Sequence, residues 1–276
     1  MSTTTTRVSL MRPAAWAGQP AEVAVSTRDG GTSTGDWTSL NLGLRVGDDP
    51  ERVRENRRRV LAALGTASDR LVLGEQVHGR SVAVVDSTHA GRGAVDSESA
   101  IPGVDALVTS DPGVLIGVLV ADCLPIALLD PDAGVLGIAH AGWRGTLARV
   151  AEATVEAMAA LGARPERMTA VLGPCIATDD YEVGPEVAEA ALDCFGGTAG
   201  RPPLTGGSSP LLRPSPGREG HWMFDLAAAN RRILTEVGVP WASVHGGEVA
   251  TGPQTPFFSH RLEAPTGRFG MFARLR

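Results

Sequence analysis

Three short apolar segments in one stretch of the chain constrain the fold more than any other feature. Residues 114–120 and 124–129 are largely branched and apolar, and residues 135–139 follow the turn sequence Asp130-Pro131-Asp132-Ala133-Gly134. Apolar runs of this length between turn residues are typical of buried strands. Proline and glycine at these places favour a four-residue loop built on a type I turn. We therefore expect the second and third segments to form a buried antiparallel hairpin.

The hairpin also fixes which side chains meet. If residues 131–134 form the loop, Pro125 faces His140 and Cys123 faces Gly142. Cys123 and His140 are then diagonal neighbours on one face, with backbones roughly 7–8 Å apart. A slip of one residue would put them on opposite faces. In the expected register, a thiolate and an imidazole can share a metal ion or a proton.

Other segments carry recognisable helix and strand signals. Asp49 and Pro50 suit the N-cap and first residue of a helix that ends at Gly65. Its other face has five arginines (Arg52, Arg54, Arg57, Arg58 and Arg59), which we expect to be mostly solvated, with contact to an anionic ligand as the alternative. Apolar periodicity predicts further helices over 146–161, 185–194 and 225–237. Short strands are expected over 71–74, 81–85 and 169–172, and a pair of short strands over 257–261 and 266–268.

Composition limits the classes of function. The chain has 276 residues and a net charge of -6, which argues against a nucleic-acid surface. All of its basic residues are arginines, so catalytic lysine chemistry is excluded. Three scattered cysteines form no disulfide framework, and no signal-peptide core or membrane-length run is visible, so we expect a cytoplasmic protein. We predict a single α/β domain over 1–276, with a loose leader at 1–20 and a mobile insertion at 196–220.

The chemistry-bearing residues are dispersed rather than gathered in one motif. His78, Cys123 and His140 each lie in a glycine-punctuated turn at an expected strand end. Three such ligands fit a catalytic zinc site with one open position. Cys123 and His140 also fit a nucleophile and its base. Three unrelated structural residues would give the same pattern, so the residues alone leave these alternatives open.

The order of whole motifs adds a resemblance. From about residue 25 to residue 275 the chain contains STRDGGTS, SLNLG, VGDDPERVRENR, GEQVHG, ADCLPI, HAGWRG, LGPCI with YEVG, and FFSHR with TGR. In this order they resemble the YfiH-type family. Its members have been described as laccase-domain or polyphenol-oxidase-like proteins and as purine nucleoside phosphorylases. One branch edits peptidoglycan precursors.

The resemblance implies a fold, a site and an activity. The fold is a four-layer α-β-β-α sandwich with mixed sheets, the YfiH-like cysteine hydrolase fold. The site is a zinc ion held by His78, Cys123 and His140. The activity is phosphorolysis of adenosine, inosine, guanosine and S-methyl-5'-thioadenosine, with adenosine deamination as a second reaction. The partners are then a purine nucleoside and phosphate, with no nucleic acid or membrane, and the protein is a monomer or homodimer.

Phosphorolysis needs a phosphate clamp as well as a nucleoside site. Arg28, Arg144 and Arg261 stand in turn-like motifs and are the candidates for this clamp. Asn41 suits a ribose hydroxyl or a phosphate oxygen. Asp122 suits a support for the neighbouring Cys123 or a proton carrier. Each of these polar residues fits a structural loop role equally well.

Two departures from the family pattern bear on the metal and the rival functions. Ala250-Thr251 stands where many members have a cysteine, and two histidines with one cysteine suit zinc better than a copper cluster. A copper-dependent polyphenol oxidase is therefore the weaker alternative. His260 stands where a tyrosine is usual. The other rivals are an amidase of UDP-MurNAc-amino acid precursors, with Cys123 as nucleophile and His140 as base, and a non-catalytic metal-binding module.

Overall fold

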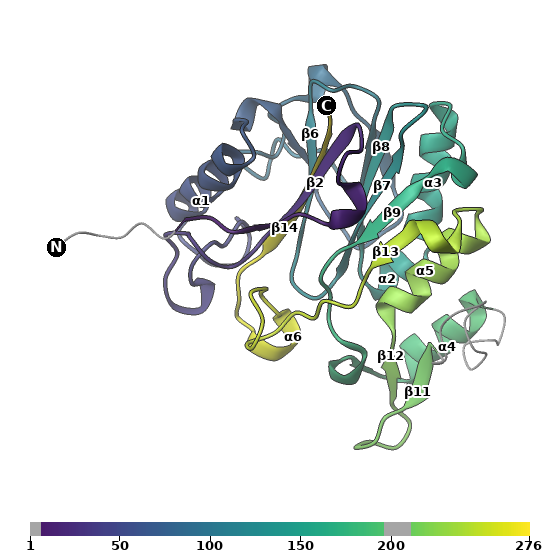
Figure 1. Ribbon diagram of the computed structural model, residues 1–276. Coiled ribbons are helices and arrows are strands. Elements are labelled where there is room, and N and C mark those ends of the chain that lie inside the picture. The colour runs from purple at the N-terminus through teal and green to yellow at the C-terminus, as the bar shows by residue number, and fades with distance from the viewer. Residues whose placement is uncertain (1–6, 196–210) are drawn as a thin grey trace.

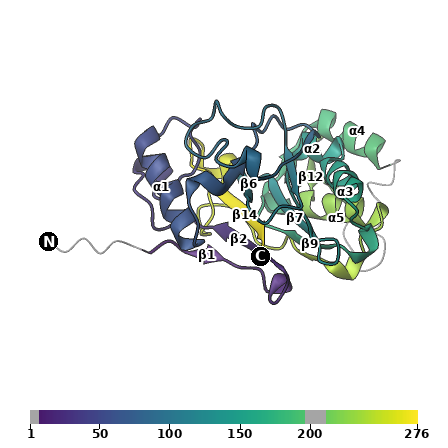
Figure 2. The same cartoon turned by 90° about the horizontal axis from the view of Figure 1, so that it is seen from above.

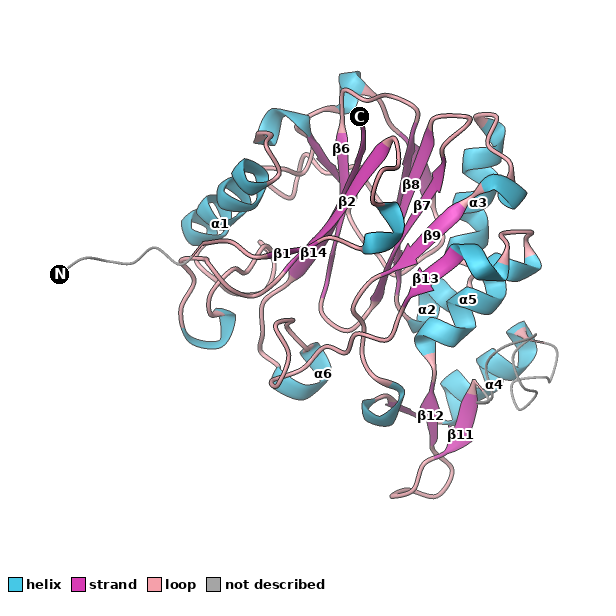
Figure 3. Ribbon diagram, in the orientation of Figure 1, coloured by secondary structure: helices cyan, strands magenta, loops and turns pink. Residues whose placement is uncertain are grey.

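The computed structural model describes residues 7–195 and 211–276. The fold is mixed α/β, with two large sheets and one small sheet (Figures 1 and 3). The five-stranded sheet has the order β1-β2-β14-β6-β3, formed by Leu10–Met11, Ala21–Ser26, Phe269–Leu275, Leu115–Val120 and Leu71–Leu73. In this sheet β3 runs parallel to β6, and the other pairs are antiparallel.

The six-stranded sheet contains the hairpin. Its order is β13-β9-β7-β8-β5-β4, formed by Val244–Gly246, Thr169–Leu172, Leu124–Asp130, Val135–Ala141, Ala106–Thr109 and Val82–Val84. The small sheet is β10-β12-β11, from Glu182–Val183, Trp222–Phe224 and Leu212–Pro214. The helices are α1 (Pro50–Ala63), α2 (Trp143–Leu147), α3 (Val150–Ala160), α4 (Pro185–Cys194), α5 (Leu226–Glu236) and α6 (His260–Glu263).

The predicted hairpin register is confirmed. Asp130 pairs with Val135 and Pro125 with His140 along β7 and β8. Both strands are buried along their whole length. The backbone amides of Asp132 and Ala133 donate to the Asp130 carboxylate, which closes the turn.

Apolar alternation along the strands sorts the core into clusters. In β6, Ile116, Val118 and Val120 pack among β7 and β8 side chains of the other large sheet. Leu115, at the start of β6 and on its other face, packs with residues of α1. On the opposite side, α3 and α5 cover the outer face of β7 and β8. The view from above places α1 at one side of the strands and α3 and α5 at the other (Figure 2).

Helix α1 begins as predicted, with Asp49 accepting a hydrogen bond from the Glu51 amide and Pro50 as the first residue. One expectation about its polar face is wrong. Arg57 is buried, because its guanidinium donates to the carbonyl oxygens of Leu42, Gly93 and Ala94. Two of these carbonyl oxygens belong to a loop far along the chain, and they bind the guanidinium where we had expected solvent.

Two other elements differ from expectation. The helix expected over 146–161 is divided into α2 and α3, because Arg149 takes a left-handed conformation with φ 63°. The end of the chain does not form two short strands at 257–261 and 266–268. Residues 260–263 form α6 instead, and the last strand, β14, lies centrally between β2 and β6.

The predicted leader and insertion lie only partly within the described residues. Residues 1–6 and 196–210 fall outside them. Within the leader, β1 pairs with β2 and Trp16 is buried. Within the insertion, residues 212–214 form β11. Among the described residues, no helix combines the length and the apolar character needed to cross a membrane.

Candidate metal centre and pocket

His78, Cys123 and His140 come together at one place. Their candidate ligand atoms all lie within 4.8 Å of one another. His78 is exposed, Cys123 is half-buried and His140 is buried, so the cluster is open on the His78 side. The two imidazoles meet edge to face, with ring centroids 4.8 Å apart. Three nitrogen and sulfur donors that leave one side open match the donor set of a catalytic metal site.

Connections between the two large sheets position His78 and Cys123, and a strand positions His140. His78 lies on the link from β3 to β4, and Cys123 on the link from β6 to β7. His140 lies near the end of β8, opposite Pro125 in the confirmed register. The site therefore forms where the chain passes twice from one sheet to the other.

Asp105 connects the segments that carry His78 and His140, a role that the sequence analysis did not identify. One carboxylate oxygen accepts a 2.8 Å hydrogen bond from His140 Nδ1 and a 2.9 Å bond from the His78 amide. The other oxygen accepts from the amides of Gly79, at 2.7 Å, and Val77, at 3.2 Å. Because Nδ1 of His140 is held by Asp105, Nε2 is the ring nitrogen left for a ligand.

The charges of the cluster stabilise one another. Burial opposes the thiolate of Cys123, but the charge of His140 and hydrogen bonds from both histidines outweigh it and lower the Cys123 pKa to about 6. Burial likewise opposes the imidazolium of His140, but Cys123 and Asp105 outweigh it and raise the His140 pKa to about 9. The thiolate is therefore the favoured form of Cys123, as metal binding requires.

Backbone strain is concentrated here. His78 and Asp122 have φ of 62° and 89°, in the left-handed region that costs non-glycine residues energy. Asp122 is held on both carboxylate oxygens, by Thr251 Oγ1 and by the Arg261 amide, each at 2.6 Å. Its carbonyl accepts from the Ile176 amide. These bonds fasten the Cys123 turn to two distant loops.

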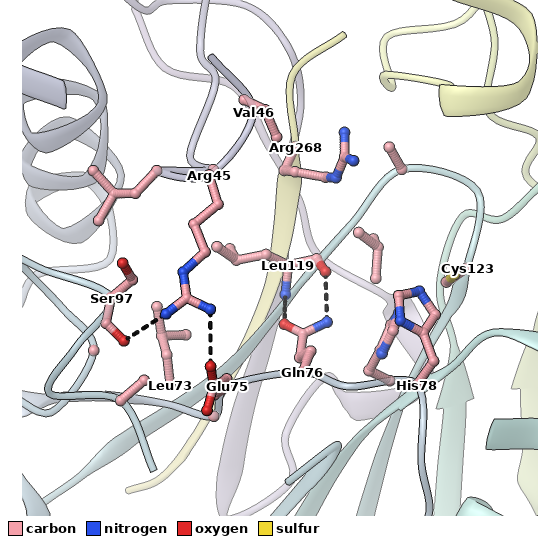
Figure 4. Close-up of a pocket in the computed structure, with 18 of the residues that line it drawn as sticks. Arg45, Val46, Leu73, Glu75, Gln76, His78, Ser97, Leu119, Cys123 and Arg268 are labelled. Carbon is pink, nitrogen blue, oxygen red and sulfur yellow. Dashed lines mark hydrogen bonds and ion pairs between the residues drawn. The ribbon is translucent and has the colours of Figure 1, made fainter. Parts of the chain in front are cut away.

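A cavity of about 440 Å³ opens beside the cluster and includes His78, Cys123 and His140 in its wall. That volume falls in the range of small-molecule sites. Figure 4 shows the Arg45–Glu75 ion pair on one side of the cavity and His78 and Cys123 on the other. Gln76 lies between them, where its amide exchanges two hydrogen bonds with the backbone of Leu119.

The predicted phosphate and ribose residues do not line this cavity. Arg28 is ion-paired with Glu263, and Arg261 donates to the Glu182 carbonyl. Arg144 is exposed and lies over the ring of its neighbour Trp143. Asn41 is fully buried and bonded to Gly43, Asp48 and the Arg268 amide.

Other polar side chains take their place in the cavity wall: Arg45, Glu75, Gln76, Arg57, His260 and Arg268. Several of them belong to motifs already singled out, GEQVHG, FFSHR and TGR. A local motif does not show which of its members faces a cavity, so the sequence pointed to the motif but not to the residue.

The comparisons with known proteins agree with this architecture. Residues 22–276 match the profile of a family described as multi-copper polyphenol oxidoreductase laccase. The chain belongs to this family. The resemblance to the laccase-like, YfiH-type family is thereby confirmed.

Relatives within the family have differing names. A purine nucleoside phosphorylase of Deinococcus radiodurans is 42% identical over 248 residues, which cover 89% of this chain and 85% of that protein. An adenosine deaminase called RL5, from an unknown prokaryotic organism, is 40% identical over 84% of this chain and 85% of its own length. The crystal structure of YlmD from Geobacillus stearothermophilus matches with a TM-score of 0.87 at 35% identity, covering 100% of this chain and 98% of YlmD.

Proposed function

We propose that this family member is a zinc-dependent purine nucleoside phosphorylase that works on adenosine, inosine, guanosine and S-methyl-5'-thioadenosine. The observation that carries the proposal is the His78, Cys123 and His140 cluster in the wall of a nucleoside-sized cavity. The name of the Deinococcus relative supports it. The reactants are then a nucleoside and phosphate, bound by the protein as a monomer or homodimer without nucleic acid or membrane.

The donor set fits zinc. Thiolate and imidazole are ligands that zinc prefers, and structural support for a histidine ligand by a carboxylate is typical of zinc sites. His78 Nδ1 or Nε2, Cys123 Sγ and His140 Nε2 would hold the ion, with Asp105 fixing the His140 ring. When bound, zinc acts as a Lewis acid and lowers the pKa of a bound water to about 7.

In phosphorolysis, an oxygen of phosphate forms a bond to the ribose C1' as the C1'–N9 bond breaks. The electron pair of that bond leaves with the purine, which takes up a proton, and the products are free base and ribose 1-phosphate. Binding of both reactants in one cavity would bring them together and displace water, which would hydrolyse the nucleoside instead. His260, in α6, is exposed and lines the cavity, so it is a candidate for the proton carrier.

Adenosine deamination is the second candidate. Its support is the name of the RL5 relative and the open side of the cluster, where a water would sit next to the purine. Water would add to C6 and ammonia would leave, so inosine forms and no phosphate is consumed.

We further propose a four-layer arrangement of α1, the two large sheets, and α3 with α5, supported by three stacked apolar clusters. Free Cys123, Cys175 and Cys194 support a reducing, cytoplasmic location.

The experiment is metal analysis of the purified protein alongside adenosine turnover with and without phosphate. We expect one zinc per chain and adenine that appears only with phosphate. Inosine without phosphate would favour deamination. Cys123→Ala should lose metal and turnover together, whereas Cys194→Ala, on α4, should keep both. A metal-free Cys123→Ala protein that still releases adenine would contradict the role of zinc.

The rival functions give different outcomes in the same assay. No purine product together with release of an amino acid from UDP-MurNAc-amino acid would support the amidase with Cys123 as nucleophile. Oxidation of a phenol that requires added copper would support the polyphenol oxidase. Stable metal with no turnover of any of these substrates would support a non-catalytic metal-binding module.

A further inference from the structure

We propose that phosphate binds against a wall formed by Arg268 and Arg57 where they meet residues 42 and 43, rather than at the arginines that the sequence suggested. This inference rests on the proposed function, because it names the subsite for the second reactant. Both arginines line the same cavity as His78, Cys123 and His140. The ligand class is a small tetrahedral oxyanion.

Arg268 is a cation without a carboxylate partner among the described residues. Its Nη1 donates to the carbonyl oxygens of Thr266 and Gly267, at 3.2 and 2.9 Å. Burial lowers the pKa of Arg268, and only the charges of Cys123 and Asp122 oppose that effect. In Figure 4 its guanidinium lies in the cavity between Arg45 and Cys123. A bound anion would supply the direct ion pair that no described carboxylate gives Arg268.

Arg57 reinforces the same wall from behind. It is only 7% exposed, and it donates to three main-chain carbonyl oxygens, which do not neutralise its charge. Burial lowers the pKa of Arg57 to about 10. Arg57 Nε binds the Leu42 carbonyl, at 2.8 Å, one residue before the position that Arg268 covers. Two arginines without a carboxylate partner in the described parts of the chain therefore contact adjacent backbone positions, Leu42 and Gly43.

Specific contacts hold the two segments of this wall together. Asn41 Oδ1 accepts from the amides of both Gly43 and Arg268, which holds the two segments side by side. A Cβ at Gly43 would come within 2.8 Å of Arg268 Cγ, so glycine lets the arginine stem lie flat on the backbone. The remaining cavity arginine, Arg45, is already neutralised by Glu75 at 2.9 Å. The net positive charge of the cavity thus lies at Arg268 and Arg57.

The experiment measures phosphate binding directly, by titration calorimetry on zinc-loaded protein at constant ionic strength, together with adenosine phosphorolysis. Arg268→Met should weaken phosphate binding about ten- to a hundredfold and raise the KM for phosphate, because a charge-assisted hydrogen bond is lost. Adenosine affinity should change little. Arg268→Lys should recover part of the loss. Arg58→Met, the exposed neighbour of Arg57 on α1, removes the same charge outside the cavity and should leave both affinities unchanged.

Several outcomes would overturn the subsite: unchanged phosphate affinity in Arg268→Met, an equal loss in Arg58→Met, or an equal loss of adenosine affinity. A loss in Arg144→Met or Arg261→Met with none in Arg268→Met would return the clamp to those residues. The two proposals fail separately. If the wild type binds phosphate through Arg268 but releases no adenine, the phosphorylase proposal fails and the anion subsite stands.

Discussion

Asp105 shows how much of the candidate site depends on one buried carboxylate. Its carboxylate accepts hydrogen bonds from His140 and from three successive amides of the His78 turn. It is buried, so each of these bonds would be costly to lose. It acts as a positioning residue for both imidazoles.

Replacing Asp105 tests that role. In Asp105→Asn the NH₂ group faces N–H donors whichever way the amide is turned, either His140 Nδ1 with the His78 amide or the amides of Val77 and Gly79, so one of these two pairs loses its acceptor. We expect zinc affinity to fall about 10- to 100-fold, measured by competition with a chelator. Asp111→Asn is the matched control, since Asp111 also accepts from backbone amides, of Ser87 and Gly113. Equal zinc affinity in the two variants would count against Asp105.

Gly142 allows a second test at the scale of one atom. It is the N-cap of α2 at φ -75°, a conformation open to alanine, but a Cβ there would lie 2.8 Å from Cys123 Sγ and 3.2 Å from His78 Cδ2. Gly142→Ala should therefore fold and bind zinc more weakly. Gly184→Ala, at the N-cap of α4 with φ -80°, meets nothing closer than 4.0 Å and should bind zinc normally. Normal zinc binding in Gly142→Ala would contradict this prediction, because Cys123 and His78 would then be able to shift away from the added methyl group.

At the scale of the element, Asp130 stabilises the turn of the β7–β8 hairpin. His140 lies near the other end of the same hairpin. The Asp130 carboxylate accepts from the amides of Asp132, Ala133 and Arg164 and from the Arg167 guanidinium. Burial would raise the pKa of Asp130, but the Arg164 amide and Arg167 outweigh burial and hold it below the usual range. The carboxylate is therefore favoured in the folded state.

This arrangement predicts a dependence of stability on pH. Because the folded pKa of Asp130 is lowered, its contribution is complete above the unfolded value of about 4 and is lost as pH falls through the folded value. Asp130→Asn should lower the free energy of unfolding at pH 7 by about 2 kcal/mol, and the difference from wild type should shrink below pH 4. Urea unfolding at several pH values measures this. A difference that stays constant with pH would assign the effect to packing, and exposed Asp132→Asn serves as control.

At the scale of the whole molecule, the candidate metal ligands come from both large sheets. His78 and Cys123 lie on links between the two sheets, and His140 lies within β8 of the six-stranded sheet. A bound ion would therefore connect both sheets, and by mass action it would stabilise the folded chain.

Chelation should consequently lower the melting temperature of the wild type and leave that of Cys123→Ala unchanged. Thermal unfolding with and without a strong zinc chelator measures the shift, and Cys194→Ala should respond as the wild type does. If the chelator destabilised Cys123→Ala equally, it would be acting somewhere other than this cluster.

Local patterns predicted the parts of the fold that local chemistry decides. The turn at 131–134 set the β7–β8 register, and Asp49-Pro50 set the start of α1. Burial of Arg57 depends on the carbonyls of residues 93 and 94, far along the chain. No periodicity within α1 could report that pairing.

The site was predictable to a similar extent. The three ligand candidates stood out because histidine and cysteine are rare in this chain and lie in glycine turns. Asp105 did not, since its role appears only when β5 pairs with β8 beside the His78 turn. The sequence did not identify the arginines that line the cavity, because a turn motif gives no direction to a long side chain.

The carboxylate of Asp105 has one more consequence, for how the ion arrives. The amides of Val77, His78 and Gly79 are bonded to the Asp105 carboxylate, so their protection from deuterium exchange should persist after chelation of the metal. The metal ion would then bind at a site whose candidate ligands are already in position. The rate of metal binding would be limited by loss of water from the ion's hydration shell and by diffusion through the cavity opening. It would not be limited by a conformational change of the polypeptide.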